Sequence, residues 1–407
     1  MKITVGPYPI GGRVTPPPSK SHVHRLLIAA ALCGEGQETV IRCPGENADI
    51  AATVRCLKAL DTDILWQDGG FRVARDFPLH FFQTPKMLDC GESGSTLRFL
   101  LPLCAAKPHA TDAPIVLIGS GRLPSRPNGP LLQALRDHGA SMDGEYLPLT
   151  VTGGLTSGDY QLPGDVSSQY FSGLLFALPL LPGDSTLRFS SPLESRPYVD
   201  LTLSVLEQFG IRVTEAENGW RIPGGQRYVS PGTAEAEGDW SAAAFWLGAN
   251  ALGSAVEPEG LNPVSCQGDR AMSALLSRIG GDIDVTDTPD LMPVLSVVAA
   301  AMPGKTTRIT GAARLRLKES DRLAAMAKTI RALGGMAEET ADGLLIHGVK
   351  LKGGTVEGMN DHRVVMSAAI AATACEGPVT ILGAEAVNKS YPDFWKDFEA
   401  LGGFLHG

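Results

Sequence analysis

The sequence predicts a mixed α/β (α+β) fold of two domains, each made of three β-α-β-α-β-β units, which gives the chain a pseudo-sixfold repeat. Three observations lead to this prediction. A polar start, an apolar run of small residues, a break and a short β-rich segment follow one another six times. Glycine-containing helix endings recur about every 70 residues, with one interval shortened. A chain of 407 residues also exceeds what one core usually supports, which favours two domains of three units.

The apolar runs have the length and composition of helices, because Ala and Leu favour helix and the alanines permit close packing. The clearest runs are residues 25–32, 240–252, 291–302 and 363–375. Each run begins after polar residues that would lie at a helix N-terminus. These six polar starts are Ser19-Lys20-Ser21, Ser93-Gly94-Ser95-Thr96, Ser167-Ser168-Gln169, Gly238-Asp239-Trp240-Ser241, Pro289-Asp290 and Asn360-Asp361-His362-Arg363.

Short strands and second helices follow the apolar runs. The strands are predicted at 39–41, 115–118, 186–189, 307–309 and 379–381, where β-branched residues are frequent. A glycine just past a helix is a C-cap signal, and the first copy has Asp61 in its place. The glycines that end the second helices are Gly139, Gly210, Gly280, Gly334 and Gly402.

Hairpins close most units. The turns are predicted at Gly69-Gly70, Asn218-Gly219 and Asp342-Gly343, because these dipeptides favour tight turns between strands. The shortened fourth copy shows no clear return strand after residues 282–285, and the sixth lacks one strand that residues 2–5 are predicted to supply. The first domain is therefore predicted at 1–18 plus 234–407 and the second at 19–233, with crossings at 16–18 and 230–233.

Composition narrows the class of function. The chain has 35 basic and 44 acidic residues, a net charge of −9, which argues against nucleic-acid or anionic-membrane binding. Seven scattered cysteines without a C-x-x-C pair argue against a disulfide framework or a zinc ribbon. The most apolar run, residues 171–181, is too short to cross a bilayer, and the first ten residues do not resemble a signal peptide. We expect a soluble, cytoplasmic protein.

Several polar starts combine cations with helix N-termini, a pattern that favours anion binding. In the first, Lys20 and Arg25 flank serines, and the alternative is solvated charge beside an N-cap serine. In the segment 316–322, Lys318 and Arg322 are spaced i, i+4 at a predicted helix start, with acids between them. A carboxylate among cations can move protons near an anionic substrate. The alternative is a charged helix face with salt bridges.

Taken together, these segments resemble the 5-enolpyruvylshikimate-3-phosphate (EPSP) synthase family over nearly the whole chain. The resemblance implies two inside-out α/β barrel domains with the active site in the cleft between them. It implies transfer of the enolpyruvyl group of phosphoenolpyruvate to the 5-hydroxyl of shikimate 3-phosphate by addition and elimination, with release of phosphate. It also implies a monomer that needs no metal or organic cofactor. The matching residues are Ser19-Lys20-Ser21 with Arg25, Gly94-Ser95 with Arg98, Arg122 with Arg126-Pro127, Ser167-Ser168-Gln169, residues 318–322, Asp361-His362-Arg363, and Lys389 before Pro392-Asp393.

The resemblance also implies roles for individual residues. Asp290 orients and deprotonates the 5-hydroxyl, Glu319 protonates the methylene carbon and later removes a proton, and Lys20 and Lys318 support charge and proton movement. Ser21 and Arg25 bind the shikimate carboxylate, whereas Ser167, Ser168 and Ser195 bind its phosphate. The residues that hold phosphoenolpyruvate are Lys20, Gly94, Arg122, Gln169, Arg322, Arg363 and Lys389.

The chain departs from the family pattern at Pro18, at Ser95 and at Glu92, which stands where an asparagine is usual. A carboxylate beside a phosphate repels it unless the carboxylate is paired. Three alternatives stay open. An enolpyruvyl transferase for UDP-N-acetylglucosamine would use a loop cysteine that residues 119–127 lack, and an RNA-end cyclase conflicts with the acidic charge. A non-catalytic anion-binding protein would not need Asp290 and Glu319.

Overall fold

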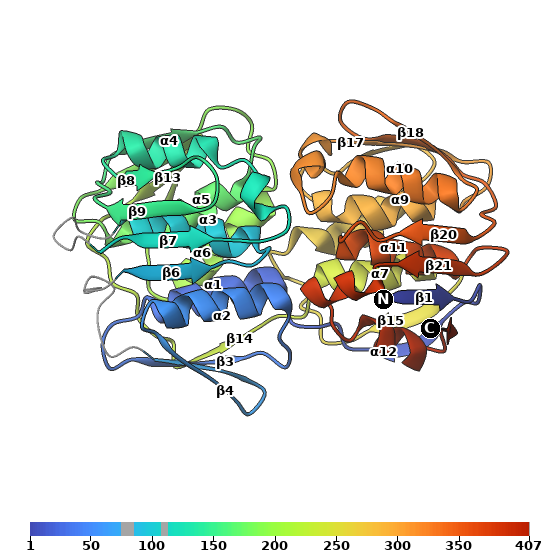
Figure 1. Ribbon diagram of the computed structural model, residues 1–407, viewed down its shortest axis with the longest axis horizontal. Helices are drawn as coiled ribbons and strands as arrows, with labels where there is room; N and C mark the ends of the chain where they lie inside the picture. Colours follow the sequence, from blue (N-terminus) through green and yellow to red (C-terminus); the bar gives the residue numbers. More distant parts are fainter. Residues whose placement is uncertain (75–84, 107–112, 407) are drawn as a thin grey trace. The chain divides into compact units, whose positions relative to one another are not determined.

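The computed structural model describes residues 1–74, 85–106 and 113–406. The chain forms two compact units (Figure 1). Unit 1 consists of Met1–Ser19 and Glu237–Gly407, and unit 2 of Lys20–Ala236. Both units alternate helices and strands, as the predicted mixed α/β fold requires.

Within its described residues, unit 2 contains three four-stranded sheets, β14-β3-β5-β4, β6-β7-β9-β8 and β10-β11-β13-β12. In each sheet the first two strands are parallel and the remaining neighbours are antiparallel. The elements are α1 (Lys20–Ala31), β3 (Glu38–Arg42), α2 (Ala48–Ala59), β4 (Asp63–Gln67), β5 (Gly70–Ala74), β6 (Lys86–Asp89), α3 (Gly94–Ala105), β7 (Ile115–Ile118), η1 (Leu123–Ser125), α4 (Gly129–Asp137), β8 (Ser141–Asp143), β9 (Leu149–Gly153), β10 (Asp159–Leu162), α5 (Ser168–Ala177), η2 (Leu178–Leu180), β11 (Ser185–Phe189), α6 (Arg196–Gln208), β12 (Thr214–Ala216), β13 (Gly219–Ile222) and β14 (Thr233–Glu235).

Unit 1 repeats this plan with one reduced sheet. Its described residues form the four-stranded sheets β16-β17-β19-β18 and β20-β21-β1-β22 and the two-stranded sheet β15-β2. The elements are β1 (Lys2–Val5), β2 (Gly11–Val14), α7 (Trp240–Ala251), β15 (Ala255–Pro258), η3 (Gly268–Ala271), α8 (Met272–Leu276), β16 (Asp282–Asp284), η4 (Pro289–Leu291), α9 (Met292–Ala300), β17 (Thr306–Thr310), η5 (Ala313–Leu317), α10 (Arg322–Ala332), β18 (Met336–Glu339), β19 (Leu344–His347), β20 (Gly354–Glu357), α11 (His362–Ala372), β21 (Val379–Leu382), η6 (Ala384–Lys389), α12 (Phe394–Ala400) and β22 (Leu405–His406).

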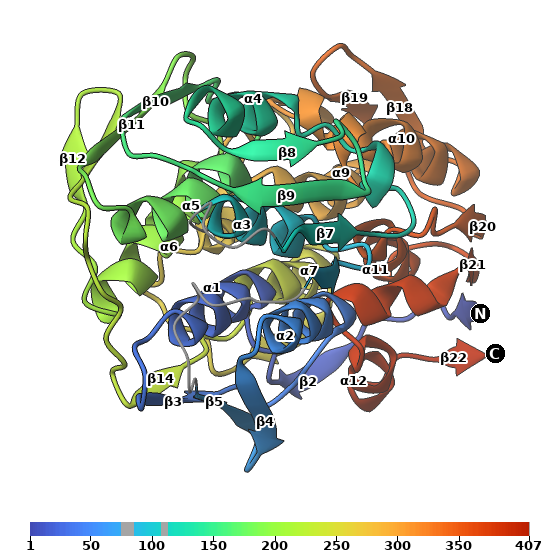
Figure 2. The same ribbon diagram turned by 60° about the vertical axis from the view of Figure 1, so that its left-hand side comes forward.

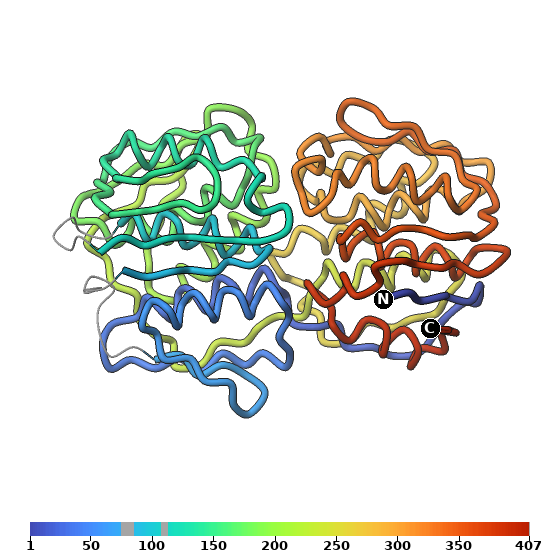
Figure 3. The backbone as a smooth tube through the Cα atoms, in the orientation of Figure 1, coloured from blue at the N-terminus to red at the C-terminus, as the bar shows by residue number. Residues whose placement is uncertain are grey.

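The beginning of the chain completes the last repeat. Strand β1 pairs antiparallel with β21, with Ile3 opposite Ile381, and β22 lies on its other side (Figure 2). Residues that are more than 370 positions apart in the sequence therefore share one sheet. The same arrangement is visible as dark blue beside red in the chain trace (Figure 3).

Two further strands lie next to the crossings between the units. Strand β14 is the parallel neighbour of β3, with Ala234 opposite Ile41, and so belongs to a sheet of unit 2. Strand β2 is the parallel neighbour of β15, with Gly12 opposite Val256, and supplies the first strand of the reduced copy. Strand β2 was not predicted, because Gly-Gly-Arg-Val lacks the alternating pattern of a half-buried strand. The predicted end of the second domain, residue 233, falls inside β14.

Three helices form the centre of each unit, and most of their apolar residues are buried. In unit 2, α3 contacts both α1 and α5, and in unit 1, α7, α9 and α11 contact one another. All residues of α9 and α11 are buried, which is expected only for helices inside a core. A Cβ on Gly173 of α5 would lie 2.1 Å from the carbonyl oxygen of Arg98, so this glycine lets α5 approach α3. Within each unit, polar starts therefore lie at the N-terminal ends of packed central helices.

Helix endings follow the predicted glycines, but the first two hairpins turn one residue earlier than predicted, because Gln67 pairs with Gly70 and Ala216 with Gly219. The five predicted C-cap glycines all have positive φ, and Asp61 takes the same left-handed conformation at φ 59°. The first hairpin does not turn at Gly69-Gly70. Asp68 and Gly69 occupy the left-handed positions, while Gly70 lies in β5, where a Cβ would meet the carbonyl oxygen of Ile41 at 2.2 Å. The second glycine is therefore required for close strand packing and not for the turn.

Candidate active site

The predicted catalytic segment of unit 1 lies before a helix and not on it. Helix α10 begins at Arg322, and Asp321 caps it by accepting a hydrogen bond from the backbone N–H of Ala324. Lys318 has an extended backbone between η5 and α10, so the predicted i, i+4 arrangement of Lys318 and Arg322 on one helix is wrong. The Asp321 cap fixes the helix start, because it satisfies an N–H group that would otherwise have no partner in the helix.

Arg322 is the centre of this cluster. Its side chain is 2% exposed, and it donates from Nε to Asp361 at 2.8 Å, from Nη1 to Asp290 at 2.9 Å and from Nη2 to Glu319 at 2.6 Å. The planar guanidinium thus joins carboxylates from three different segments. Burial alone would lower the pKa of Arg322, but the three carboxylates raise it, so the side chain stays charged. Arg322 was predicted to bind phosphoenolpyruvate; the geometry gives it the additional task of holding the two predicted proton carriers.

Asp290 lies in η4 and is shared by two arginines. The second is Arg363 of α11, whose Nη2 donates to Oδ2 of Asp290 at 2.8 Å. Burial alone would raise the pKa of Asp290, but Arg363, Lys318 and Arg322 together hold it well below its ordinary value. Asp290 is therefore an ionised hydrogen-bond acceptor at neutral pH, even though its carboxylate is mostly buried.

The start of α11 is fixed by Asp361. This residue is fully buried, caps the helix through the N–H of Arg363, and accepts from the Ser320 hydroxyl at 2.9 Å. Burial would raise the pKa of Asp361, whereas Arg322 lowers it, with a net decrease. Lys389 donates from Nζ to the carbonyl oxygen of Asn360 at 2.6 Å. Lys389, Arg363 and Asp361 therefore lie around the same helix start.

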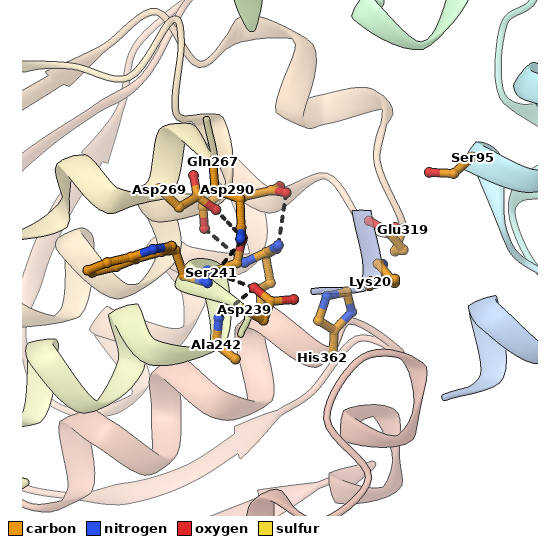
Figure 4. A network of polar contacts seen from close by, with 12 residues as sticks. Lys20, Ser95, Asp239, Ser241, Ala242, Gln267, Asp269, Asp290, Glu319 and His362 are labelled. Carbon is orange, nitrogen blue, oxygen red and sulfur yellow. Dashed lines mark hydrogen bonds and ion pairs between the residues drawn. The ribbon is translucent and has the colours of Figure 1, made fainter. Parts of the chain in front are cut away.

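A second polar network in unit 1 surrounds the start of α7 (Figure 4). Asp239 caps this helix and accepts from the N–H groups of Ser241 at 2.7 Å and Ala242 at 3.1 Å. The Ser241 hydroxyl donates to Oδ2 of Asp269 in η3. Gln267 accepts from the N–H of Trp240 at 3.1 Å. The sequence identified Asp239 and Ser241 only as part of a polar start and did not single out Gln267 or Asp269.

In unit 2, the first polar start is tied to structural partners. Lys20 Nζ lies 2.8 Å from Oδ2 of Asp49 in α2. Arg25 is 2% exposed, and its guanidinium donates to the Thr202 and Ser172 hydroxyls and to the carbonyl oxygens of Ser21 and Tyr198. These neutral partners come from α1, α5 and α6. Because none of them is a carboxylate, this network leaves the positive charge of Arg25 uncompensated.

The second and third polar starts meet at the ends of α3 and α5. Arg98 Nη1 donates to Oε1 of Gln169 at 2.7 Å, and Nε2 of Gln169 donates to the Ser95 hydroxyl at 2.9 Å. Arg126 Nη1 lies against Gly94, 2.8 Å from where a Cβ would be. The Arg126 side chain is 6% exposed, and its buried Nε has no hydrogen-bond partner among the described residues. Two arginines and a helix N-terminus thus converge on a glycine, which is an anion-binding arrangement.

The remaining predicted ligands of unit 2 differ in exposure. Ser167 caps α5, and Ser168 begins that helix and is buried. Ser195 precedes α6, is buried, and has a left-handed backbone at φ 55°. Arg122, predicted to bind phosphoenolpyruvate, is exposed in the turn before η1, and Ser21 is half-buried in α1. Arg126 is therefore the buried arginine of this loop, a residue that the sequence identified only as part of the motif.

Glu92, the unusual residue of the second start, packs against the loop that carries Arg122. A Cβ on Gly121 would lie 2.4 Å from Oε2 of Glu92, and Gly121 has a left-handed φ of 57°. A side chain at residue 121 would collide with Glu92 and would also be strained by the left-handed backbone. Glu92 thus shapes the loop between β7 and η1.

No metal-binding arrangement of three or more His, Cys, Asp or Glu side chains occurs in the part of the chain that the structure describes. Over the same residues, no helix has the length and apolar character needed to cross a membrane.

The fold and these clusters define an α/β protein with buried arginines and carboxylates at the starts of its central helices. A family model described as EPSP synthase (3-phosphoshikimate 1-carboxyvinyltransferase) matches residues 5–288 and 280–398. The chain therefore belongs to the EPSP synthase family.

Individual relatives agree with this assignment. The chain is 40% identical to the 3-phosphoshikimate 1-carboxyvinyltransferase of Clostridium acetobutylicum, over 99% of this chain and 98% of that protein. It is 39% identical to the enzyme of the same name from Halobacterium salinarum, over the full length of both. Among solved structures, an EPSP synthase from Acinetobacter baumannii is similar with a TM-score of 0.79 and 26% identity, covering both chains completely.

Proposed function

We propose that this protein is a 3-phosphoshikimate 1-carboxyvinyltransferase. It transfers the enolpyruvyl group of phosphoenolpyruvate to the 5-hydroxyl of shikimate 3-phosphate and releases phosphate. The observation that carries the proposal is the cluster in which Arg322 and Arg363 hold Asp290, and Arg322 also holds Glu319. Two acids are fixed among cations. A reaction that moves protons on anionic substrates requires such an arrangement.

Asp290 is the residue that orients the 5-hydroxyl in this proposal. Its carboxylate is ionised because two arginines hold its pKa low, so it accepts a hydrogen bond from the hydroxyl before any proton is transferred. A carboxylate with such a low pKa is a weak base. Proton transfer becomes favourable when the arginines turn part of their interaction toward the phosphate and carboxylate of phosphoenolpyruvate, because Asp290 then regains basicity.

Glu319 acts on the other substrate. Its carboxyl group is held by Arg322 and its side chain is 16% exposed, so it is positioned but reachable. It donates a proton to the methylene carbon during addition and removes a proton during elimination. The charge of Lys318 helps to keep the pKa of Asp290 low. Lys20 supports the movement of charge and protons during the reaction.

The binding roles are divided between the units. Gly94, Gln169 and Arg122 of unit 2 and Arg322, Arg363 and Lys389 of unit 1 bind phosphoenolpyruvate together with Lys20. Ser21, Arg25, Ser167, Ser168 and Ser195 bind shikimate 3-phosphate. The convergence of Arg126 on Gly94 adds Arg126 to the first group. Both half-sites serve one reaction in this proposal, and the protein acts as a cytoplasmic monomer without nucleic acid, metal or organic cofactor.

Phosphate release tests the proposal. Purified protein is incubated with phosphoenolpyruvate plus either shikimate 3-phosphate or UDP-N-acetylglucosamine. We expect phosphate to be released only with shikimate 3-phosphate, in a one-to-one ratio with the enolpyruvyl product. Release with UDP-N-acetylglucosamine, or release that does not depend on shikimate 3-phosphate, would contradict the proposal.

A further inference from the structure

Asp269 is a buried acid near the reaction cluster that the mechanism above does not use. It lies in η3 and is 2% exposed. One carboxyl oxygen, Oδ2, accepts from the Ser241 hydroxyl, whereas Oδ1 is buried and has no hydrogen-bond partner among the described residues. An ionised carboxylate has about four acceptor sites, so a single hydroxyl leaves it poorly solvated. Burial of this kind favours the protonated acid.

The charged groups around Asp269 also favour its protonated form. Asp239 faces it from the start of α7, Asp290 from η4, and Arg363 from α11. Arg363 donates to Asp290 at 2.8 Å, and Arg270, on the same short helix as Asp269, donates to the carbonyl oxygen of Pro263. Two acids and one arginine that already binds an acid therefore surround Asp269.

The two neighbouring acids are shifted in opposite directions. Burial, and next the charge of Asp290, raise the pKa of Asp269 to about 7, whereas the pKa of Asp290 is lowered by its arginines. When two carboxyl groups lie close together, one ionises more readily and the other retains its proton. The geometry assigns the ionised state to Asp290, which has two arginines, and the neutral state to Asp269.

We propose that Asp269 is a positioning residue that holds a proton during turnover and so keeps Arg363 available to Asp290 and to the anionic substrate. When Asp269 loses this proton, a further negative charge appears beside the Asp290–Arg363 pair. The positive potential that attracts phosphoenolpyruvate then falls, and the KM for phosphoenolpyruvate rises. The inference rests on the proposed function, because it names a control on the same reaction.

Kinetics at two pH values test the inference. The kcat/KM for phosphoenolpyruvate is measured at about pH 6 and about pH 8, and the ratio is taken within each variant to cancel general losses. An acid with a pKa of about 7 is mostly neutral at the first pH and about nine-tenths ionised at the second. Between these pH values, we expect kcat/KM of the wild type to fall by about tenfold more than that of Asp269→Asn, mainly because KM rises. Substrate ionisation is the same in both proteins and does not affect the comparison.

Two further variants sharpen the test. Ser241→Ala removes a hydroxyl that stabilises the ionised form, so the alkaline decrease should move to higher pH. Asp397→Asn is the matched control, because burial raises the pKa of Asp397 in α12 while its partner is Tyr391. Its ratio should equal that of the wild type. Equal ratios in wild type and Asp269→Asn would overturn the inference, as would an Asp397→Asn ratio that matches Asp269→Asn.

A readout without catalysis separates this inference from the proposed function. Infrared difference spectra between about pH 6 and about pH 8 should show a protonated carboxylic acid band that disappears at the higher pH in the wild type and is absent from Asp269→Asn. Difference spectra that are the same in the wild type and in Asp269→Asn would overturn the inference, even if the enzyme is active. A protein that shows the band but releases no phosphate would instead contradict the proposed function.

Discussion

Glu319 lies between η5 and α10, outside the helices and strands, and Arg322 contacts its carboxyl group. Its carboxyl group contacts Nη2 of Arg322 at 2.6 Å from the bend between η5 and α10. This tether is enough for positioning, because Arg322 is itself fixed by Asp361 and Asp290. The consequence is that an uncharged side chain of the same shape can still occupy this position and accept from Arg322.

We therefore expect Glu319→Gln to fold normally and to lose activity. The amide keeps the shape and a hydrogen-bond acceptor for Arg322 but cannot exchange a proton, so kcat should fall by a factor on the order of 10² to 10⁴. Steady-state kinetics and far-UV circular dichroism measure the two properties. Asp290→Asn should lower kcat similarly, although it also weakens two ion pairs. Full turnover by both folded variants would contradict the assigned roles.

Gly94 provides a second test, directed at binding. A Cβ at this position would lie 2.8 Å from Nη1 of Arg126 and 3.0 Å from Nη1 of Arg98, so both guanidinium groups must move. We expect Gly94→Ala to raise the KM for phosphoenolpyruvate about tenfold or more, because displaced donors lose their alignment with the anion. The free energy of unfolding should change little, since alanine is well accepted within a helix.

Gly129→Ala is the matched control for this variant. Gly129 is also the first residue of a helix, α4, and a Cβ there meets nothing within 4 Å. Its KM should equal that of the wild type. A similar rise in KM in both variants would show that the effect comes from the helix start in general and not from the two arginines.

At the scale of elements, the polar starts predicted from the sequence are the N-termini of the six central helices or short helical turns. Side-chain caps at Ser93, Ser167, Asp239 and Asp361 are visible in the structure. The sequence could indicate these positions because a capping residue before an apolar run is a local signal. It could not place Lys318 in the break between η5 and α10, because contacts such as those of Arg316 with Asp321 and Glu339 leave no local pattern in the sequence.

The cap of α10 can be tested separately from the charges nearby. Asp321→Ala removes the acceptor for the Ala324 N–H and should destabilise the helix start by about 1 kcal/mol. Hydrogen exchange in the first turn of α10 should become faster, and kcat should fall moderately because Arg322 is the first helical residue. Asp321→Asn keeps a capping oxygen but loses the negative charge opposite Arg316, so it should retain slow exchange. Equal exchange in both variants would rule out the cap as the cause.

At the scale of the whole molecule, the repeat explains what was predictable and what was not. Alternating apolar residues marked 2–5 as a strand, and the sixth copy lacked one, so the pairing of β1 with β21 could be anticipated. Strands β2 and β14 have no such pattern, since each is short and partly polar. Their places are set by parallel neighbours in a sheet that forms elsewhere in the sequence. Long-range pairing of this kind leaves no local trace.

The candidate site divides in the same way. Residue types at helix starts were readable as anion ligands, because local charge and capping patterns indicate them. Which arginine points inward was not readable, since Arg122 and Arg126 have the same chemistry and lie four residues apart in one loop. Burial and the approach to Gly94 distinguish them. Asp269 was missed because a single acid carries no sequence signal until its neighbours are known.

The buried acids of unit 1 together predict how its stability depends on pH. Asp290 and Asp361 have lowered pKa values in the folded protein, so they stabilise it above their unfolded pKa of about 4, and this contribution is lost as pH falls through their folded pKa values. Asp269 has the opposite sign. Its pKa is raised to about 7, so its favourable contribution is complete below about pH 4 and is lost as pH rises toward 7.

Asp269→Asn should therefore stabilise unit 1 relative to the wild type, by an amount that grows between about pH 4 and pH 7 and then stays constant. The difference should reach a few kcal/mol, because each unit of pKa shift corresponds to about 1.4 kcal/mol. Hydrogen exchange of peptides from α7 and α11 measures unit 1 directly, while α3 and α5 of unit 2 serve as the internal reference. A stability difference that does not vary with pH would mean that Asp269 has the same charge in the folded and unfolded chains.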